Sequence, residues 1–116
     1  MGLRNVQAEV ALPSAARGAG TYTSGPLAAA GTAADVLLSV HCTAASGTPT
    51  LDCSLEESAD GSTWTAVPGS AAAQLAAVGN RVAGAGITKN YVRVTSTVGG
   101  TTPSMTYRVA LWIRPE

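Results

Sequence analysis

The amino-acid sequence predicts an all-β protein: a single antiparallel β-sandwich of about seven to eight short strands with an extended N-terminal arm. Three observations support this fold class. Apolar and polar residues alternate along several short segments, glycine and proline separate these segments, and two of the segments repeat each other. A length of 116 residues fits one domain with one modest core.

The chain divides into two parts. Residues 1–30 are predicted to form an N-terminal arm or loop segment, and residues 31–116 are predicted to form the β-sandwich domain. The arm is expected because the run 13–20 carries small side chains typical of a loop. In segment 70–86, strand and loop are favoured over helix because glycines interrupt the helix formers. Strand-like segments are expected near residues 20–23, 26–29, 34–44, 50–58, 63–67, 72–77, 80–84, 89–98 and 104–114.

Alternation assigns one face of each longer segment to the core, because successive side chains of a strand point to opposite faces. Trp112 falls on the opposite, outward face of the last strand. The residues predicted to be buried are Val36, Leu38, Val40, Cys42, Leu51, Cys53, Leu55, Met105, Tyr107, Val109, Leu111 and Ile113.

An internal repeat links the middle of the chain to its end. Residues 39–58 align without a gap on residues 93–112. Each copy is predicted to be a hairpin whose turn ends in Thr-Pro, at Thr48-Pro49 and at Thr102-Pro103. Two hairpins that each have one apolar face can bury those faces against each other as a sandwich.

The stretch ESADGSTWTAV, residues 57–67, is the clearest motif. Its residues Ser58, Asp60, Gly61 and Trp64 resemble the Asp-box of sialidase-like propeller blades with one residue missing. In those proteins the motif is mainly a structural turn. Asp60 and Gly61 are predicted to form a tight type I′ turn, since Asp tolerates positive φ and Gly adopts it freely. Trp64 is expected to lay its ring across the hairpin.

Residues that could carry catalysis or hold a metal are few. His41 is the only histidine, and alternation points His41 and Cys42 to opposite faces. Glu56 and Glu57 also face opposite ways. Free core thiols are favoured for Cys42 and Cys53, although a disulfide across the first predicted hairpin stays open. We predict no catalytic residue, no cofactor, no metal site and no enzymatic activity.

The charge balance restricts the partner. Seven Lys plus Arg balance seven Asp plus Glu, which leaves no net field to attract nucleic acid or an anionic membrane. Charged residues make up only 12% of the chain, as in surfaces that pack against another protein. The sequence shows no signal-peptide-like or membrane-spanning apolar run, so we expect synthesis in a cytoplasm.

The succession GTPTLDCSLEESADGSTWTAVPG and, later, NYVRVTSTVGGTTPSMTYRVALW resembles a family of small tailed-phage structural proteins. The resemblance covers about residues 34–114 and depends on the turn 58–64 and on Tyr91-Val92-Arg93. Members of this family are capsid decoration, head or tail proteins. The resemblance implies a non-enzymatic virion protein and supplies no catalytic residues.

These observations together predict a capsid decoration, or cement, protein of a bacteriophage. It would bind the outer surface of the shell, bridge major capsid subunits and stabilise the capsid, with synthesis in the host cytoplasm and location on the virion surface. The expected partners are the major capsid protein and further copies of the chain, as a trimer. The residues expected to bind the shell from the arm are Leu3, Val6, Val10, Leu12 and Tyr22.

Two alternatives remain open at this stage. The first is another place in the virion, as a tail tube, tail tip or head–tail protein. The second belongs to a different class: a carbohydrate-binding module for host-surface glycans, which would need an aromatic ring on a solvent face. Trp112 is the residue that alternation places outward.

Overall fold

The computed structural model describes residues 7–28 and 34–115, and every regular element in these ranges is a β-strand. Seven strands pair in an antiparallel arrangement, which confirms the predicted all-β class. Segment 70–86 is loop and strand rather than helix, as predicted, but the strand expected at 72–77 is a loop. The strands are β1 (Gln7–Arg17), β2 (Gly20–Thr23), β3 (Leu27–Ala28), β4 (Ala34–Ser58), β5 (Thr65–Ala66), β6 (Gly79–Ile87) and β7 (Tyr91–Pro115).

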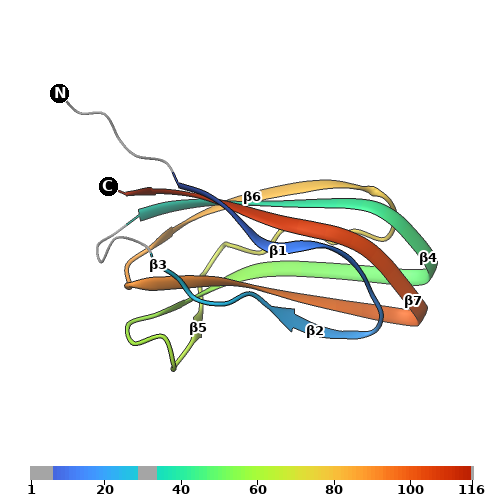
Figure 1. The fold of residues 1–116 in the computed structure, drawn as a ribbon, viewed down its shortest axis with the longest axis horizontal. Coiled ribbons are helices and arrows are strands. Elements are labelled where there is room, and N and C mark those ends of the chain that lie inside the picture. Colours follow the sequence, from blue (N-terminus) through green and yellow to red (C-terminus); the bar gives the residue numbers. More distant parts are fainter. Residues whose placement is uncertain (1–6, 29–33, 116) are drawn as a thin grey trace.

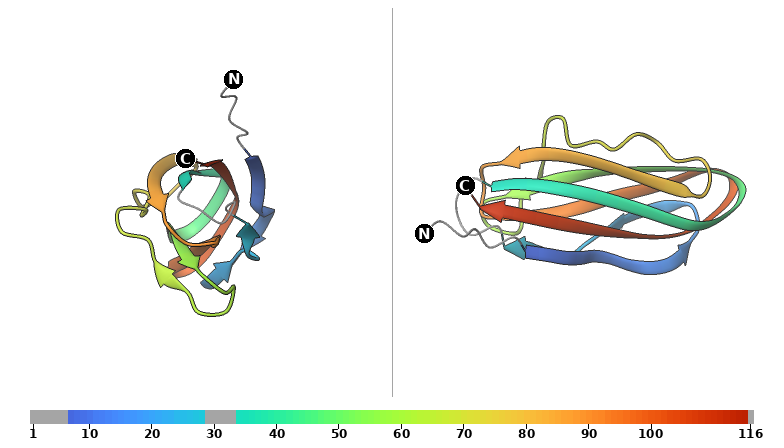
Figure 2. Two further views of the ribbon diagram at one scale, coloured as in Figure 1. Left: turned by 90° about the vertical axis from the view of Figure 1, so that its left-hand side faces the viewer. Right: turned by 90° about the horizontal axis from the view of Figure 1, so that it is seen from above.

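Two long strands build both layers of the sandwich. β4 and β7 are 25 residues each and pair along their whole length. They bend together at one end of the molecule and pass from the upper layer to the lower one (Figure 1). The upper layer holds β6, residues 34–42 of β4, residues 105–115 of β7, and β1. The lower layer holds β5, the other halves of β4 and β7, and β2 with β3. Figure 2 shows the two layers end-on, around the core.

The two predicted hairpins are not present, and the two repeats pair with each other instead. Cys42 lies opposite Tyr107, and Cys53 lies opposite Ser96. The alternating pattern has the same period whichever strand lies alongside, so it could not select the partner. Each residue of one repeat pairs with the other repeat in almost the same way as its aligned counterpart does. The two repeats are therefore related by an approximate twofold axis centred on the bend.

The Thr-Pro signals mark this bend rather than reversing turns. The register of β4 shifts between Ser46 and Thr48, as in a β-bulge that redirects a strand. Gly47 has a φ of +74°, and a Cβ there would lie only 2.2 Å from the carbonyl oxygen of Thr102. The two backbones therefore meet too closely at the bend for any side chain at position 47.

The predicted core is confirmed, since every residue that alternation assigned to it is buried. Inside it, Ser96 Oγ and Tyr107 Oη form a hydrogen bond of 2.7 Å that satisfies both hydroxyls. Cys42 and Cys53 are free thiols. Burial, with a smaller contribution from Asp52, raises the pKa of Cys53 to about 12, so this thiol is held in its protonated, unreactive form.

The N-terminal segment differs from the expected arm wherever it is described. Residues 7–17 pair with β7 as β1, and Leu12 belongs to the core. β1 thereby covers one edge of β7 that would otherwise be unpaired. Register shifts on both sides of Leu12 interrupt the alternation of β1, and for this reason the sequence pattern resembled a loop.

The motif around Asp60 is a longer loop than the predicted type I′ turn. Glu57 pairs with Thr65, so residues 58–64 form the connection. Gly61 has a φ of +80°, whereas Asp60 does not have the positive φ that a type I′ turn requires. Ser58 Oγ accepts hydrogen bonds from the backbone N–H groups of Asp60 and Gly61. Asp60 Oδ1 accepts two more, from the N–H groups of Ser62 and Thr63 at 2.8 and 2.9 Å.

Asp60 is expected to titrate far below an ordinary aspartate. The N–H of Thr63, then that of Ser62, and the Ser58 hydroxyl lower its pKa to about 2. Because the folded pKa lies below the unfolded one, Asp60 stabilises the fold above about pH 4, and this stabilisation is lost as the pH falls towards 2. An NMR titration of the Asp60 carboxyl carbon checks this. Ser58→Ala should raise the pKa, and a value of 3.8 in the wild-type protein would contradict the loop geometry.

Candidate interaction surface

The outer surface of the upper layer carries an exposed apolar region. Val10, Leu37, Val82 and Trp112 are 58%, 43%, 59% and 38% exposed, and they come from β1, β4, β6 and β7 respectively. We call these four residues the outer apolar face. Monomeric soluble proteins rarely expose contiguous apolar patches of this kind, and such patches usually mark interaction sites.

Strand register makes the outer apolar face continuous. Leu37 pairs with Gly84 of β6 on one side and with Trp112 of β7 on the other. In the adjacent row of the sheet, Ser39 pairs with Val82 and with Ala110, and Ala110 pairs with Val10. Paired residues point to the same side of a sheet, so these side chains share one surface that crosses all four strands.

A hollow of about 400 Å³ opens in the outer apolar face. It is lined by Leu37, Gly84 and Trp112, and an ion pair between Arg114 and Asp35, 2.8 Å long, forms its charged edge. The hollow exists because Gly84 brings no side chain to the row that Leu37 and Trp112 occupy. The lining carries one positive and one negative group, so it favours an uncharged occupant.

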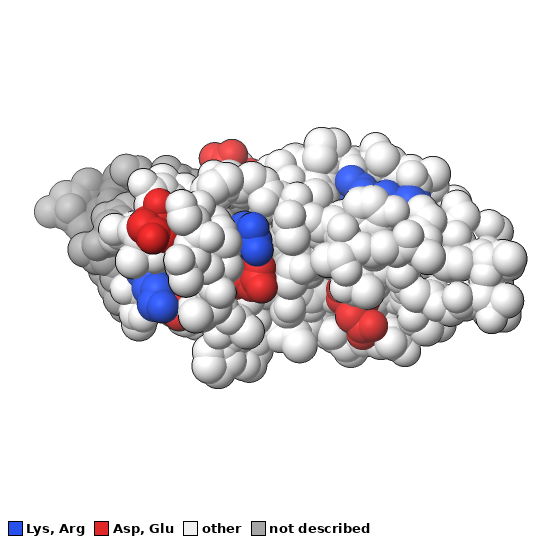
Figure 3. Space-filling view, turned by 90° about the horizontal axis from the view of Figure 1, so that it is seen from below, with Lys and Arg blue, Asp and Glu red and all other residues white. Residues whose placement is uncertain are grey.

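The outer surface of the lower layer has a different character. Arg93 Nε lies 2.8 Å from Glu56 Oε1, and the Arg93 guanidinium stacks 4.4 Å from the ring centroid of Trp64. Gln74 Nε2 donates to the carboxylate of Asp52 at 3.0 Å. Figure 3, which views the molecule from below, shows acidic and basic groups scattered over mainly uncharged surface. These polar groups already satisfy one another, so this surface has less to gain from a partner.

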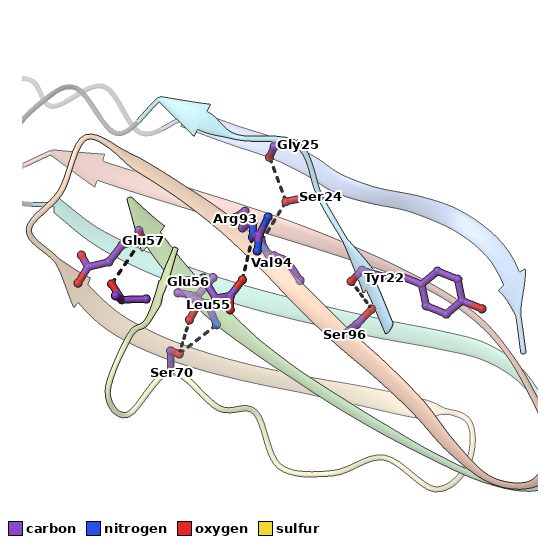
Figure 4. Close-up of polar contacts among 11 residues, drawn as sticks. Tyr22, Ser24, Gly25, Leu55, Glu56, Glu57, Ser70, Arg93, Val94 and Ser96 are labelled. Atoms are coloured by element: carbon purple, nitrogen blue, oxygen red, sulfur yellow. Dashed lines mark hydrogen bonds and ion pairs between the residues drawn. The ribbon is translucent and has the colours of Figure 1, made fainter. Parts of the chain in front are cut away.

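In the lower layer, two serine hydroxyls accept hydrogen bonds from backbone N–H groups of β4 and β7. Ser70 Oγ accepts from the N–H of Leu55 at 3.0 Å, and Ser24 Oγ accepts from the N–H of Val94 at 2.9 Å (Figure 4). In residues 7–28 and 34–115, every buried side-chain polar atom has a hydrogen-bond partner. Within these ranges, no buried side-chain nitrogen or oxygen atom therefore needs a ligand to complete its hydrogen bonding.

The described part of the chain contains no group of three or more His, Cys, Asp or Glu residues that could hold a metal ion. His41 contacts the side chain of Asn80 through Nδ1, while Cys42 is buried on the other face of β4. A histidine base and a cysteine nucleophile are thus separated by the sheet, as alternation predicted. No helix in the described ranges is long and apolar enough to cross a membrane.

The residues predicted to bind a shell do not form one group. Leu3 and Val6 lie outside the described residues. Val10 belongs to the outer apolar face, whereas Leu12 is only 7% exposed and packs in the core. Tyr22 is half-buried on β2, where its hydroxyl donates to the carbonyl oxygen of Gly18 at 2.8 Å.

The other members of the outer apolar face were harder to identify. Trp112 lies outward, as its alternation predicted. Leu37 carries the same signal, since it is an apolar residue between the two core positions Val36 and Leu38. Val82 lies in a segment rich in Ala and Gly, where few side chains define a period.

No family model and no curated protein sequence matches the chain. Similarity is found among solved structures. The PBSX exported protein XepA superposes with a TM-score of 0.73 over 95% of this chain and 37% of that one, at 18% identity. A chain of the T13 infectious bursal disease virus particle gives 0.69 over 97% and 31%, at 14% identity, and one of the Gx strain of that virus gives 0.67 over 98% and 33%, at 13% identity.

This chain spans about a third of the length of each of these structural neighbours. At such low identity the likeness concerns the fold alone. The chain thus has a β-sandwich fold that also occurs within an exported PBSX protein and within the particles of an icosahedral virus.

Proposed function

We propose that this chain is a non-enzymatic structural protein of a phage virion, and specifically a capsid decoration protein. It binds the outer surface of the shell and bridges neighbouring major capsid subunits. The observation that carries the proposal is the outer apolar face, which exposes large apolar side chains on every strand of the upper layer. The fold shared with particle-forming and exported viral proteins supports it.

The mechanism is adhesion by apolar contact. Each square ångström of apolar surface removed from water contributes about 25 cal/mol, so a complementary surface on a shell subunit would bind without any net charge on this chain. A stable contact of this type covers about 800 Å² per partner. The compact core and the shared β4–β7 pairing make the upper layer a rigid platform, so little ordering entropy is lost on binding.

The copy number of the chain in purified virus particles tests this function, measured by quantitative mass spectrometry against the major shell protein. A number close to that of the shell protein is expected. A handful of copies would instead assign the chain to the neck or tail, as a tail tube, tail tip or head–tail protein. Absence from the particle would overturn the structural role.

A matched pair of substitutions then tests which surface binds the shell. Val10→Asp introduces a charge into the outer apolar face and should lower the copy number per particle about tenfold or more, because the carboxylate would be buried without a partner. Thr23→Asp introduces the same charge on the lower layer, where Thr23 is exposed on β2 and pairs with the uncharged Thr95, and it should leave the copy number unchanged. Equal effects of the two substitutions would argue against the outer apolar face.

A further inference from the structure

β6 is an edge strand with few of the features that usually protect an edge from pairing. Within the described ranges it pairs with β4 alone. Its nine residues follow a regular register without a bulge, and the strand contains no Pro and no Lys. Arg81 is its one charged residue, and the Arg81 side chain turns back to the carbonyl oxygen of Asn80. Long, regular edges of this kind are templates for another strand.

The side chains beside this edge are complementary to a second copy of themselves. On the outer surface of β6, the Val82 side chain extends into solvent. Two residues later, Gly84 has no side chain, and the hollow lies at this position. In an antiparallel pair of β6 strands centred on Ala83, Val82 of each copy lies opposite Gly84 of the other. Each valine then fills the hollow that Leu37 and Trp112 of the other copy line.

The charges also permit this register. With Ala83 at the centre, the two Arg81 residues face Ala85 rather than each other, so no like charges are opposed. The hollow carries one ion pair and no net charge, which suits an apolar side chain such as valine. An isologous contact of this kind closes on itself and does not grow into a fibre.

We propose that two copies of this chain associate through β6, edge to edge and antiparallel, with Val82 of each copy seated beside Gly84 of the other. The two upper layers then form one continuous sheet whose outer apolar faces lie side by side. This inference deepens the proposed function, since a pair would present twice the adhesive surface to a shell. It proposes a twofold assembly in place of the trimer expected of a decoration protein.

Sedimentation equilibrium of the purified chain, from about 1 µM to about 1 mM, tests the pairing. The mass of 11.5 kDa should rise towards twice that value with concentration. Val82→Asp places a carboxylate in the hollow, and Gly84→Val fills the hollow from within its own chain. Each should weaken the association constant about tenfold or more. Circular dichroism and urea unfolding should show that both variants remain folded, because both positions are exposed.

One control substitution separates this pairing from other contacts. Val10→Asp lies on the same surface but at the far strand, β1, and should leave the association constant unchanged. A large effect of Val10→Asp would mean that the copies stack face to face, which overturns the edge contact. A monomer at every concentration, or a trimer, would also overturn it.

A crosslinking experiment tests the register directly. Chains carrying Val82→Cys are mixed with chains carrying Gly84→Cys and then oxidised. Since these positions oppose each other across the pair, the mixture should form a disulfide-linked dimer several-fold faster than either variant alone. Equal rates in all three samples would reject the proposed register. The test uses the isolated chain, so its outcome does not depend on whether the chain occurs in virus particles.

Discussion

Gly100→Ala is expected to destabilise the protein by about 3 kcal/mol or more. Gly100 has a φ of +105°, and a Cβ on it would lie 1.9 Å from the carbonyl oxygen of Thr48 and 3.2 Å from Cα of Pro49. Both contacts are with the backbone of β4 at the bend, so a flexible side chain cannot move aside to relieve them. The free energy of unfolding in urea measures the loss.

Gly69 supplies the matched control for this substitution. It also has a positive φ, +74°, but a Cβ there would meet no atom within 4 Å. Gly69→Ala should therefore cost only the backbone term of about 1–2 kcal/mol. If Gly69→Ala and Gly100→Ala were equally destabilising, the close approach of β4 and β7 at the bend would not be what requires glycine.

Leu38→Ala is expected to lower the free energy of unfolding by about 3–4 kcal/mol. The Leu38 side chain is completely buried, so its removal leaves a cavity in the core. Its neighbour Leu37 has the same side chain on the opposite surface of β4, with 43% exposure. Leu37→Ala should cost less than about 1 kcal/mol. Urea unfolding of both variants at low micromolar concentration, where the chain is expected to be monomeric, makes the comparison.

This pair of leucines tests the central assignment of the fold. Comparable losses at the two positions would mean that both surfaces of β4 are covered within one chain, and the outer apolar face would then be part of a core. A large loss at Leu38 alone would show that the exposed Leu37 contributes little to the stability of the single chain, as expected of a residue on an interaction surface.

The two surfaces of the sandwich also suggest how the chain would sit on a partner. The lower layer pairs its own charges, as Arg93 does with Glu56, and it gains little from further contacts. The upper layer leaves Leu37 and Trp112 in water. A partner that covers the upper layer would leave the polar lower layer facing solvent, which suits a protein attached to the outside of a larger assembly.

The sequence by itself determined which side chains face the core. Along residues 34–44, 50–58 and 104–114, the period of two placed the predicted core residues correctly and Trp112 outward, whereas core residues elsewhere, such as Leu12 and Ile87, were not predicted. This succeeds because the direction of a side chain in a strand depends only on local backbone geometry. The repeat of 39–58 in 93–112 corresponds to the approximate twofold of the fold, although the two hairpins predicted from it are not present.

Only the tertiary structure decided which strands are neighbours. The Thr-Pro signals at 48–49 and 102–103 fit a reversing turn as well as a bend, and the choice depends on pairing between segments far apart in the chain. The outer apolar face depends on the same choice, because Val10 and Val82 reach Leu37 and Trp112 only once β1 and β6 flank the β4–β7 pair. A local pattern orients each side chain, whereas long-range pairing decides which side chains share a surface.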